Sequence, residues 1–290
     1  MSISGQNLSI VIVTLKSEKI IHKCIESIGQ DIPIIVVENS NNENFKNELE
    51  KKYKNLKCVL SNSNIGMGAA NNIGIKLTKT DYVLILNPDV TLFPNTLNEI
   101  YLASKNISNF TILAPISSDD MYPNYGKIEK RKIDINNYFF KVDYVDGFAM
   151  LFNKKKFKDD IYFDERFFLY LENNDLCLKV NRRGEFIYII SQSKIKHDGA
   201  KTLDIKYNDQ VELSRNWHWV WSKFYFNKKN FGILRALKET VLIYLSAIVK
   251  FLYYFMRRDN YNKKKYFNRA SGFYNAFWGK PSWYRPDLKD

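Results

Sequence analysis

The sequence predicts an α/β fold with a mostly parallel central sheet and flanking helices, followed by a helical appendage. Short apolar segments alternate with segments of helical spacing through the first 115 residues, which is typical of a parallel sheet. One of these segments, residues 82–86, ends in the turn Asn87-Pro88-Asp89. A carboxylate therefore follows the carboxyl end of a buried strand, where open α/β sheets hold their ligands.

Each expected element follows from the spacing of its apolar residues. Apolar runs predict strands at residues 8–13, 34–37, 57–60, 82–86 and 111–114. Helices are predicted at residues 17–29, 43–53, 67–77 and 94–104, the last of them opened by Pro94. Residues 117–137 are polar and predict a loop over the site or a flap that faces the acceptor. Residues 142–152 predict a strand interrupted at Asp146-Gly147, and residues 194–196 end a further short strand.

Composition limits the class of protein. The chain has 290 residues, a net charge of +13 and three cysteines. The charge predicts an anionic partner, which can be a nucleic acid, an anionic membrane surface or a phosphorylated small molecule. The cysteines form no paired metal or disulfide motif, and the amino terminus lacks the apolar run of a secretion signal. We therefore expect a cytoplasmic protein.

The carboxyl-terminal region, residues 206–290, is helical, aromatic and basic. Its segment 233–256 is apolar, but the uninterrupted part at residues 240–249 is too short to span a bilayer. We expect a helix that lies in a membrane plane or packs against the domain. Together with the basic residues that follow it, the segment 233–265 favours contact with the anionic inner face of the cell membrane. A solvated basic face over helices that pack or form a homodimer has equal weight.

Polar side chains end three strands of the predicted sheet. Thr14 follows the first strand, Glu38 and Asn39 end the second, and Asn87 and Asp89 follow the fourth. The carboxyl ends of parallel strands lie along one edge, so we expect these side chains to cluster. Asp89 is the first candidate for the working site, although Asn-Pro-Asp is also an ordinary turn sequence.

A glycine-rich stretch, residues 62–74, lies between these strand ends in the sequence. Its small residues let a ligand approach the backbone, and its helix start offers free N–H groups, which makes Asn64, Gly66 and Asn71 candidates. A dinucleotide fingerprint would follow the first strand, where this chain has no glycine, so an NAD-binding fold is disfavoured. The alternative role of the stretch is close packing of a helix on the sheet.

The second half of the chain adds acidic residues and a histidine. Glu172 and Asp175 are three residues apart at the start of a predicted helix, so both carboxylates can project from one face. Acidic residues at that position also stabilise a helix through its dipole. His197 ends a strand beside Asp198-Gly199, where it is expected to be structural or to contact a metal or phosphate.

Together these motifs resemble family 2 glycosyltransferases, and within that family the rhamnosyltransferase branch that builds bacterial cell-surface polysaccharides. The resemblance spans residues 8–202. Five motifs occur in the family's order: Val-Val-Glu-Asn-Ser at 36–40, Asn-x-Gly-x-Gly-x-x-Asn at 64–71, Leu-x-Leu-Asn-Pro-Asp at 84–89, Phe-Asp-Glu-x-Phe-Phe-x-Tyr-x-Glu-x-x-Asp-Leu-Cys at 163–177, and His-x-Gly at 197–199.

The resemblance implies a GT-A fold and an inverting transfer of a sugar from a nucleotide-diphosphate donor to a saccharide hydroxyl, with rhamnose from dTDP-rhamnose as the best guess and a lipid-linked surface-glycan precursor as acceptor. It implies a catalytic domain at residues 1–205, whose nucleotide-sugar half is about 1–115 and whose acceptor half is about 116–205. Asp89 and His197 would hold a divalent metal, Mg²⁺ or Mn²⁺, on the diphosphate. The implied donor-binding residues are Thr14, Glu38, Asn39, Asn64, Gly66, Asn71, Asn87 and Asp146.

Two departures from the family pattern matter. Glu38 stands where the family often has aspartate, which keeps the carboxylate but alters its reach. The common Glu-Asp-x-Asp motif is here Glu172-Asn173-Asn174-Asp175, so an amide replaces the carboxylate often assigned as the base. An amide cannot accept the acceptor's proton. That role therefore passes to Glu172 or Asp175, and we favour Glu172.

Three other functions stay open on the sequence. A nucleotidyltransferase would use a similar sheet, but it needs a glycine-rich basic loop after the first strand, and residues 14–17 are not one. A nucleic-acid-binding module fits the charge, yet the basic residues are dispersed and no such motif occurs, so we expect no nucleic-acid partner. A non-catalytic or partner-dependent sugar-nucleotide-binding protein is compatible with Asn173.

Overall fold

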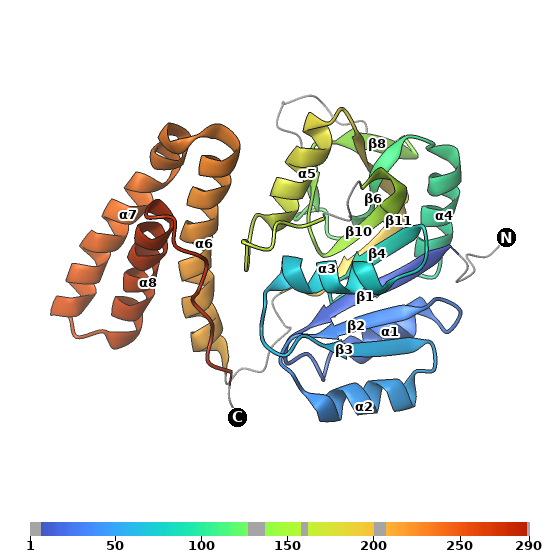
Figure 1. The fold of residues 1–290 in the computed structure, drawn as a ribbon, viewed down its shortest axis with the longest axis horizontal. Coiled ribbons are helices and arrows are strands. Elements are labelled where there is room, and N and C mark those ends of the chain that lie inside the picture. The colour runs from blue at the N-terminus through green and yellow to red at the C-terminus, as the bar shows by residue number, and fades with distance from the viewer. Residues whose placement is uncertain (1–6, 127–136, 158–161, 200–206, 289–290) are drawn as a thin grey trace. The chain divides into compact units, whose positions relative to one another are not determined.

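The computed structural model describes residues 7–126, 137–157, 162–199 and 207–288 of the chain (Figure 1). By its internal contacts the chain divides into two compact units. The sheet unit comprises Met1–Asp164 and Asn173–Leu203, and the helical unit comprises Glu165–Glu172 and Asp204–Asp290. Most of the loop predicted at residues 117–137 lies outside the described residues.

The sheet unit is built on a mixed sheet, which has nine strands among the described residues. Its main path runs β3-β2-β1-β4-β10-β6-β11-β5, and β8 pairs with β11. These strands are β1 (Leu8–Thr14), β2 (Ile34–Glu38), β3 (Leu56–Leu60), β4 (Tyr82–Leu86), β5 (Val90–Leu92), β6 (Phe110–Ser117), β8 (Phe139–Val142), β10 (Ala149–Asn153) and β11 (Phe186–His197). β7 (Tyr125–Gly126) and β9 (Tyr144–Val145) form a separate antiparallel pair.

The predicted mostly parallel sheet is confirmed. β1 pairs in parallel with β2 and β4, and β2 pairs in parallel with β3. β10 enters antiparallel between β4 and β6, whereas β11 again runs parallel to β6. The parallel half brings the carboxyl ends of β1, β2 and β4 to one edge of the sheet, as expected.

Helices cover both faces of the sheet. Every residue of β1 is buried, which is the pattern of a strand covered on two sides. Ile10 and Ile12 face a core that includes residues of α1 (Ile21–Ile28), α2 (Glu43–Lys52) and α4 (Thr96–Asn106). Val11 faces a second core with residues of α3 (Met67–Leu77) and α5 (Glu172–Arg182). The helices seen around the arrows in Figure 1 therefore bury alternate residues of the same strands.

Close packing of α3 on β1 explains part of the glycine-rich stretch. A Cβ atom added to Gly74 would lie 2.3 Å from Cγ1 of Val11, well inside van der Waals contact. Only glycine lets the helix approach the strand this closely. This part of the stretch therefore packs the helix on the sheet, as the alternative interpretation expected.

The helical unit contains α6 (Asn208–Phe231), α7 (Ile233–Met256) and α8 (Asn260–Phe277), coloured orange to red in Figure 1. Its core is aromatic and includes Trp217, Trp221, Phe224 and Phe273. Helix α7 is long and apolar enough, by length and composition alone, to cross a membrane. The sequence argument that the apolar part is too short considered only its uninterrupted residues, whereas the helix continues through Lys250 to Met256.

Some element boundaries differ from the predicted ones. The helix expected at residues 17–29 begins at Ile21, because the carbonyl oxygen of Ser17 first closes a turn with the N–H groups of Ile20 and Ile21. The helix expected from Pro94 begins at Thr96, whose hydroxyl accepts a 2.8 Å hydrogen bond from the N–H of Phe93. β11 is 12 residues long rather than short, because an irregularity between Ile190 and Lys194 lets it continue past its polar residues.

Candidate functional site

The strand-end edge gathers the first group of predicted site residues. Thr14 and Glu38 are direct partners in the register of β1 and β2, and the N–H of Asn39 donates to the carbonyl oxygen of Thr14 at 2.8 Å. Leu86 pairs with Ile12 at the end of β4, so Asn87 follows at the same edge. The parallel register therefore brings together residues that lie up to 73 positions apart, from Thr14 to Asn87.

Three buried oxygen atoms of this group have no hydrogen-bond partner among the described residues. They are Thr14 Oγ1, Asn71 Oδ1 and Asp89 Oδ1, on residues that are 0%, 3% and 7% exposed. A buried polar atom without a partner costs about 1–3 kcal/mol, so folded proteins seldom keep one without a use for it. These atoms are suited to contact a bound polar ligand or ion.

Asp89 is held against His197 by the pairing of β5 with β11. Val90 and His197 are register partners, and the N–H of Asp198 donates to the carbonyl oxygen of Asp89 at 3.1 Å. Asp89 Oδ1 consequently lies 3.3 Å from His197 Nε2, close enough for an ion pair although the two atoms are not aligned as a hydrogen bond. The ring of Phe148 stacks on His197 with centroids 4.0 Å apart, which fixes the imidazole.

This pair supplies one carboxylate oxygen and one imidazole nitrogen to a cation. The described residues contain no group of three or more His, Cys, Asp or Glu side chains that could hold a metal ion. Asp89 and His197 therefore fit a metal only if a bound ligand and water provide its other donors, as is common for Mg²⁺ bound with a phosphorylated substrate. The two atoms that would hold the metal, Asp89 Oδ1 and His197 Nε2, already face each other at 3.3 Å.

Asn39 organises the chain segment that follows β3. Its Oδ1 accepts hydrogen bonds from the N–H of Ile65 at 3.1 Å and from Ser61 Oγ at 2.9 Å, while its Nδ2 donates to Asn64 Oδ1 at 3.1 Å. Asn64 Oδ1 also accepts from the N–H of Gly66 at 3.2 Å. Gly66 precedes α3 with a positive φ of 91°, a conformation that favours glycine. The predicted residues 64 and 66 are thus positioned by Asn39.

Glu38 uses its carboxylate within its own turn. Its Oε1 accepts hydrogen bonds from the N–H and the hydroxyl of Ser40, and its Oε2 accepts from the N–H of Asn42 at 2.6 Å. Asn42 in turn caps α2 by accepting from the N–H of Phe45. Glu38 is fully buried, and these bonds fix the loop after β2.

Asp146 and Asn87 are placed by loop backbone. The N–H of Asp146 donates to the carbonyl oxygen of Asn124 at 2.9 Å, and the N–H of Asn87 donates to the carbonyl oxygen of Phe148 at 2.9 Å. Burial raises the pKa of the Asp146 carboxyl, and the nearby positive charge of protonated His197 opposes that rise. The Asp146 carboxyl therefore lies close enough to His197 for its pKa to depend on the charge of the imidazole.

The acidic residues at the start of α5 differ in environment. Glu172 is 9% exposed, its Oε2 has no hydrogen-bond partner among the described residues, and burial raises its pKa from 4.5 to about 7. Asp175 is 4% exposed. Asn173 donates from Nδ2 to the carbonyl oxygen of Val145 at 2.9 Å, so the amide that replaces the family's carboxylate ties α5 to β9. A carboxyl group with a pKa near 7 can exchange protons at neutral pH.

Sequence reasoning missed Phe148, Lys23 and Asp198 near this edge. Phe148 carries the ring that stacks on His197. Asp198 Oδ1 lies 2.8 Å from Lys196 Nζ, and its Oδ2 lies 3.5 Å from Lys23 Nζ. The sequence offered a signal for Asp198, which directly follows His197, but none for Lys23, which reaches the edge from α1.

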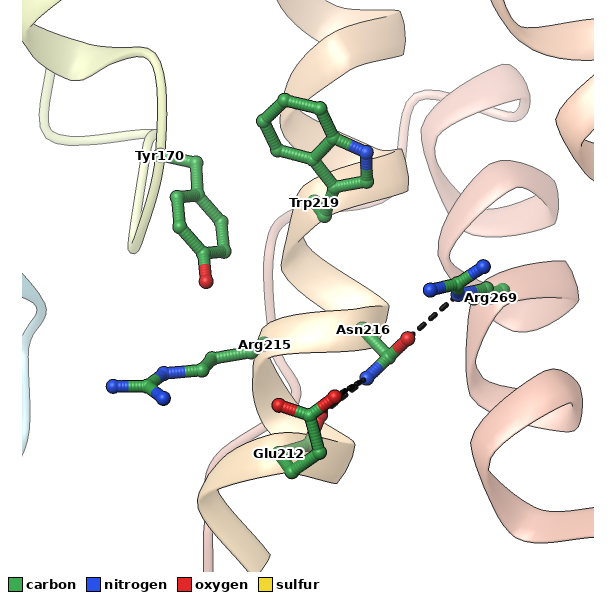
Figure 2. Close-up of a pocket in the computed structure, with 6 residues that line it drawn as sticks. All are labelled: Tyr170, Glu212, Arg215, Asn216, Trp219 and Arg269. Carbon is green, nitrogen blue, oxygen red and sulfur yellow. Dashed lines mark hydrogen bonds between the residues drawn. The ribbon is translucent and has the colours of Figure 1, made fainter. Parts of the chain in front are cut away.

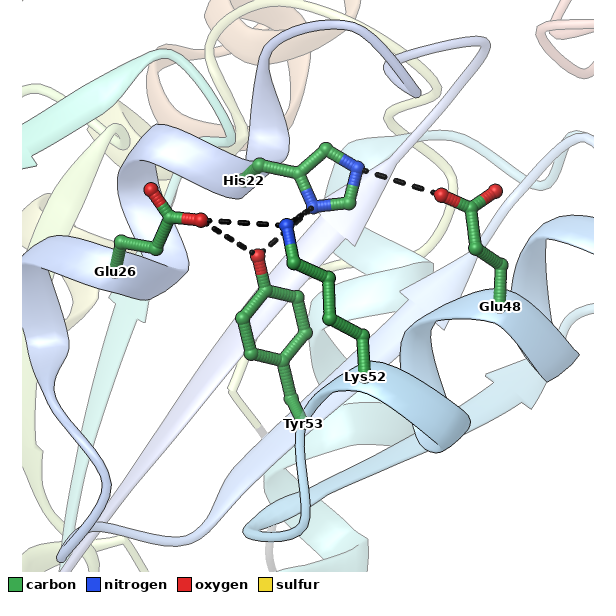
Figure 3. Close-up of polar contacts among 5 residues, drawn as sticks. All are labelled: His22, Glu26, Glu48, Lys52 and Tyr53. Atoms are coloured by element: carbon green, nitrogen blue, oxygen red, sulfur yellow. Dashed lines mark hydrogen bonds and ion pairs between the residues drawn. The ribbon is translucent and has the colours of Figure 1, made fainter.

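The other two histidines have surroundings unlike those of His197. His22 belongs to a polar group that links α1 and α2, where its Nδ1 lies 2.9 Å from the hydroxyl of Tyr53 and its Nε2 3.7 Å from Glu48 Oε1 (Figure 3). Tyr53 also donates to Glu26 Oε1 at 3.1 Å. His218 is buried in the helical unit and donates from Nε2 to the carbonyl oxygen of Tyr284 at 2.7 Å, and burial lowers its pKa to about 3. His22 therefore links α1 to α2, and His218 links α6 to the segment that contains Tyr284.

A pocket of about 200 Å³ lies within the helical unit (Figure 2). Its lining residues are Tyr170, Glu212, Arg215, Asn216, Trp219 and Arg269. The rings of Tyr170 and Trp219 meet edge to face with centroids 5.5 Å apart, and Arg269 Nε donates to Asn216 Oδ1 at 2.6 Å. Tyr170 and Leu171 both have positive φ angles, of 71° and 67°, which strains the turn that presents Tyr170. Aromatic rings beside guanidinium groups suit sugar rings and anionic groups.

The fold and the strand-end edge define an α/β protein in which polar side chains gather at the carboxyl ends of parallel strands. Comparison with protein families is consistent with this class: residues 9–161 match the model of glycosyl transferase family 2. That match covers more than half of the chain. The chain therefore belongs to glycosyl transferase family 2.

Curated relatives are similar over part of their length. The low-salt glycan biosynthesis hexosyltransferase Agl10 of Haloferax volcanii is 25% identical over 193 residues, which cover 61% of this chain and 62% of Agl10. The rhamnosyltransferase WbbL of Escherichia coli is 27% identical over 211 residues, which cover 62% of this chain and 79% of WbbL. The match thus spans less than two thirds of Agl10.

Solved structures share the fold. The crystal structure of S. aureus TarS residues 1–349 superimposes with a TM-score of 0.53 at 16% identity, covering 98% of this chain and 94% of that one. A complex of the same TarS fragment with UDP matches equally well. At this identity the likeness establishes the fold alone, and it confirms the expected GT-A architecture with a helical carboxyl-terminal region.

Proposed function

We propose that this chain is an inverting, metal-dependent glycosyltransferase that moves a sugar from a nucleotide-diphosphate donor to a saccharide hydroxyl. Membership of family 2 supports the reaction class. One observation carries the site: the buried oxygen atoms of Thr14, Asn71 and Asp89 have no hydrogen-bond partner among the described residues. A donor that supplies hydroxyl, amide and metal contacts would satisfy all three.

The donor half of the proposed site is the strand-end edge of the sheet unit. Asn39 holds Asn64 and Gly66 in place, and the amino-terminal turn of α3 follows directly, with N–H groups that can face an anionic ligand. We propose that Thr14, Glu38 and Asn39 contact the nucleoside of the donor. Asn71 is the residue of α3 that we propose to contact the donor. We propose that Asn87 and Asp146 contact the part of the donor that lies near Asp89.

Asp89 and His197 are the proposed metal ligands. Their side-chain atoms lie 3.3 Å apart, and Phe148 limits the rotation of His197. A bound Mg²⁺ or Mn²⁺ would neutralise the charge that develops on the departing diphosphate. The chain itself places the carboxylate directly before β5 and the imidazole at the end of β11, and these two strands pair with each other.

Glu172 is the proposed general base. Its raised pKa lets it take the proton of the acceptor hydroxyl at neutral pH. The hydroxyl oxygen then forms a bond to the anomeric carbon while the bond from that carbon to the diphosphate oxygen breaks, and the bonding pair leaves with the diphosphate. Attack from the side opposite the leaving group inverts the anomeric configuration. Asp175 is the alternative base.

The finer substrate assignment follows the relatives. WbbL is named a rhamnosyltransferase and Agl10 a hexosyltransferase of glycan biosynthesis, which supports a hexose or deoxyhexose donor, and we propose dTDP-rhamnose. Because a TarS structure contains UDP, UDP-sugars are the alternative donors. We infer a lipid-linked saccharide acceptor on the inner face of the cell membrane.

A donor screen tests the proposed function. The purified chain is incubated with dTDP-, UDP- and GDP-sugars, with Mg²⁺, with Mn²⁺ or with a chelator, and released nucleotide is measured with and without saccharide acceptors. We expect one donor to turn over only with metal, and Asp89→Ala to abolish that turnover. Donor binding without turnover under any condition would favour the non-catalytic sugar-nucleotide-binding alternative, and binding of no donor would overturn both.

A further inference from the structure

Helix α7 exposes a row of large apolar side chains on one side. We call this row the α7 stripe; it consists of Leu234, Leu242, Leu245, Val249, Leu252 and Met256, which are 52% to 81% exposed. From Leu242 onward its members are three or four positions apart, so they share one helix face. Within the most apolar 18-residue stretch of α7, only 11% is buried. A continuous exposed apolar surface of this kind marks a contact with a partner or a membrane.

The opposite side of α7 already has a partner within the helical unit. Ala236, Thr240 and Ala247 are buried, and the ring of Tyr244 stacks on Phe273 of α8 with centroids 4.5 Å apart. To span a bilayer, α7 would have to leave this core or carry the polar surfaces of α6 and α8 into hydrocarbon, and both are costly. A helix with one packed face and one exposed apolar face is suited to the plane of an interface.

The charge of the region favours an anionic surface as the partner. Residues 207–288 contain fifteen lysines and arginines against five aspartates and glutamates, so most of the chain's net charge of +13 lies here. Lys250, Arg257, Arg258 and Lys264 are exposed around the carboxyl end of the stripe. A second copy of this unit would bring like charges together, whereas anionic lipid headgroups would attract them.

Aromatic side chains accompany these cations at the same end of α7. The guanidinium of Arg257 lies over the ring of Tyr253 at 5.6 Å, and the ammonium of Lys250 lies over the ring of Tyr266 at 5.2 Å. Tyr253 is 45% exposed. Tyrosine beside basic residues is the combination found where proteins meet the headgroup layer.

We propose that α7 lies in the plane of an anionic lipid leaflet, with the α7 stripe among the acyl chains and the basic residues on the headgroups. The proposal does not depend on the chemistry of the sheet unit. The contact has an electrostatic part, which salt weakens, and an apolar part, which is lost when the α7 stripe is removed.

Flotation with vesicles tests the proposal on the full chain. Vesicles of phosphatidylcholine alone are compared with vesicles that also contain phosphatidylglycerol, each at low and high salt. We expect binding to the anionic vesicles, weaker binding at high salt, and little binding to the neutral ones. Arg257→Ala/Arg258→Ala should lower the affinity for anionic vesicles about 30-fold, since each basic residue near the surface contributes about fivefold.

A variant of the α7 stripe distinguishes this contact from non-specific binding to vesicles. Leu242→Glu/Leu245→Glu/Val249→Glu should reduce binding by about 100-fold or more, because three apolar side chains no longer enter the acyl region. The matched control is Leu77→Glu/Leu102→Glu, at two leucines of the sheet unit that are each 42% exposed, and it should bind like the wild type. Thermal melts followed by circular dichroism should show both variants folded.

Four results would overturn the proposal. The first is that the protein binds no vesicle, and the second is that the stripe variant binds as well as the wild type. The third is membrane association that resists extraction with alkaline carbonate. The fourth is a wild-type dimer in solution that is lost in the stripe variant while vesicle binding persists. The third would indicate a spanning helix, and the fourth would assign the stripe to a second copy.

Discussion

At the scale of single residues, two buried strand threonines provide a matched test of the site. Thr14 and Thr111 are both 0% exposed. The hydroxyl of Thr111 donates to Glu185 Oε2 at 2.9 Å, whereas that of Thr14 has no hydrogen-bond partner among the described residues. A hydroxyl kept for a ligand should cost stability in the free protein, and one that serves the fold should add to it.

We predict opposite effects for Thr14→Val and Thr111→Val. Thr14→Val should leave the free energy of unfolding unchanged or raise it by about 1 kcal/mol, while weakening donor binding about tenfold. Thr111→Val should lower the free energy of unfolding by about 1–3 kcal/mol, because it leaves a carboxylate oxygen without its donor. Urea unfolding and donor titration measure both quantities. Equal destabilisation by the two changes would remove Thr14 from the site.

The pKa of Glu172 gives a second prediction. If Glu172 is the base, the rate constant should rise with pH through about 7, where its carboxyl loses the proton, and Glu172→Gln should lower the rate about 10²- to 10⁴-fold. Donor binding should persist. Asp175→Asn is the companion variant, and a loss of rate there with Glu172→Gln near wild type would transfer the role to Asp175.

The same carboxyl affects stability with a definite sign. In the unfolded chain Glu172 loses its proton near pH 4.5, and in the folded protein near 7, so the folded state becomes less stable as pH rises between these values. The full loss is about 3 kcal/mol. Glu172→Gln should abolish this loss, so the variant should unfold at a higher temperature than the wild type at pH 8 although its rate is lower.

Patterns of residue types could predict which side chains gather at the edge, but not what each one does. The ends of β1, β2 and β4 are readable because parallel strands bring their carboxyl ends together. The carboxylate of Glu38 turned out to bind its own loop, which depends on the local path of residues 40–42. Lys23 and Phe148 reach the edge through tertiary packing alone, so no spacing in the sequence indicates them.

At the scale of elements, the crossing of α6 and α8 depends on Gly272. A Cβ atom added there would lie 2.3 Å from the carbonyl oxygen of Trp217, and backbone cannot move aside as a side chain can. An alanine in a helix usually stabilises it by about 0.5–1 kcal/mol over glycine. We predict that Gly272→Ala instead lowers the free energy of unfolding by about 1–3 kcal/mol, because the helices must separate.

Tryptophan fluorescence can measure this effect, since Trp217 and Trp221 belong to the core that the two helices share. The control is Lys264→Ala, an exposed position of the same helix, which changes helix propensity without a close contact. A stabilising effect of Gly272→Ala would show that the two helices do not cross as closely as described.

Elements with strong periodicity were predictable and short or irregular ones were not. The helix at residues 67–77 has the predicted bounds, because its apolar spacing and its flanking residues agree. β5 has three residues, too few for any period, and it forms because β11 offers it an edge. The length of β11 depends on an irregularity that apolar spacing cannot indicate.

At the scale of the whole molecule, the chain combines a family 2 sheet unit with a basic helical unit. Residues 165–172 end at the first residue of α5 but group with the helical unit. There Phe167 joins the core, and the hydroxyl of Ser222 donates to the carbonyl oxygen of Leu169 at 2.7 Å. Contacts between such distant segments depend on packing, so a local pattern does not reveal them. The motif at 163–177 therefore contributes to both units.

The most direct test of the proposed donor site is a calorimetric titration of UDP and dTDP into the wild type and Asp89→Asn, with Mn²⁺ or with a chelator. The control is Asp31→Asn, an exposed acid that precedes β2 and so lies away from the strand-end edge. We predict metal-dependent binding of one nucleotide by the wild type and the control, weakened about 100-fold in Asp89→Asn, which loses a metal ligand. Equal affinity in all three proteins, with or without metal, would contradict a donor site at Asp89.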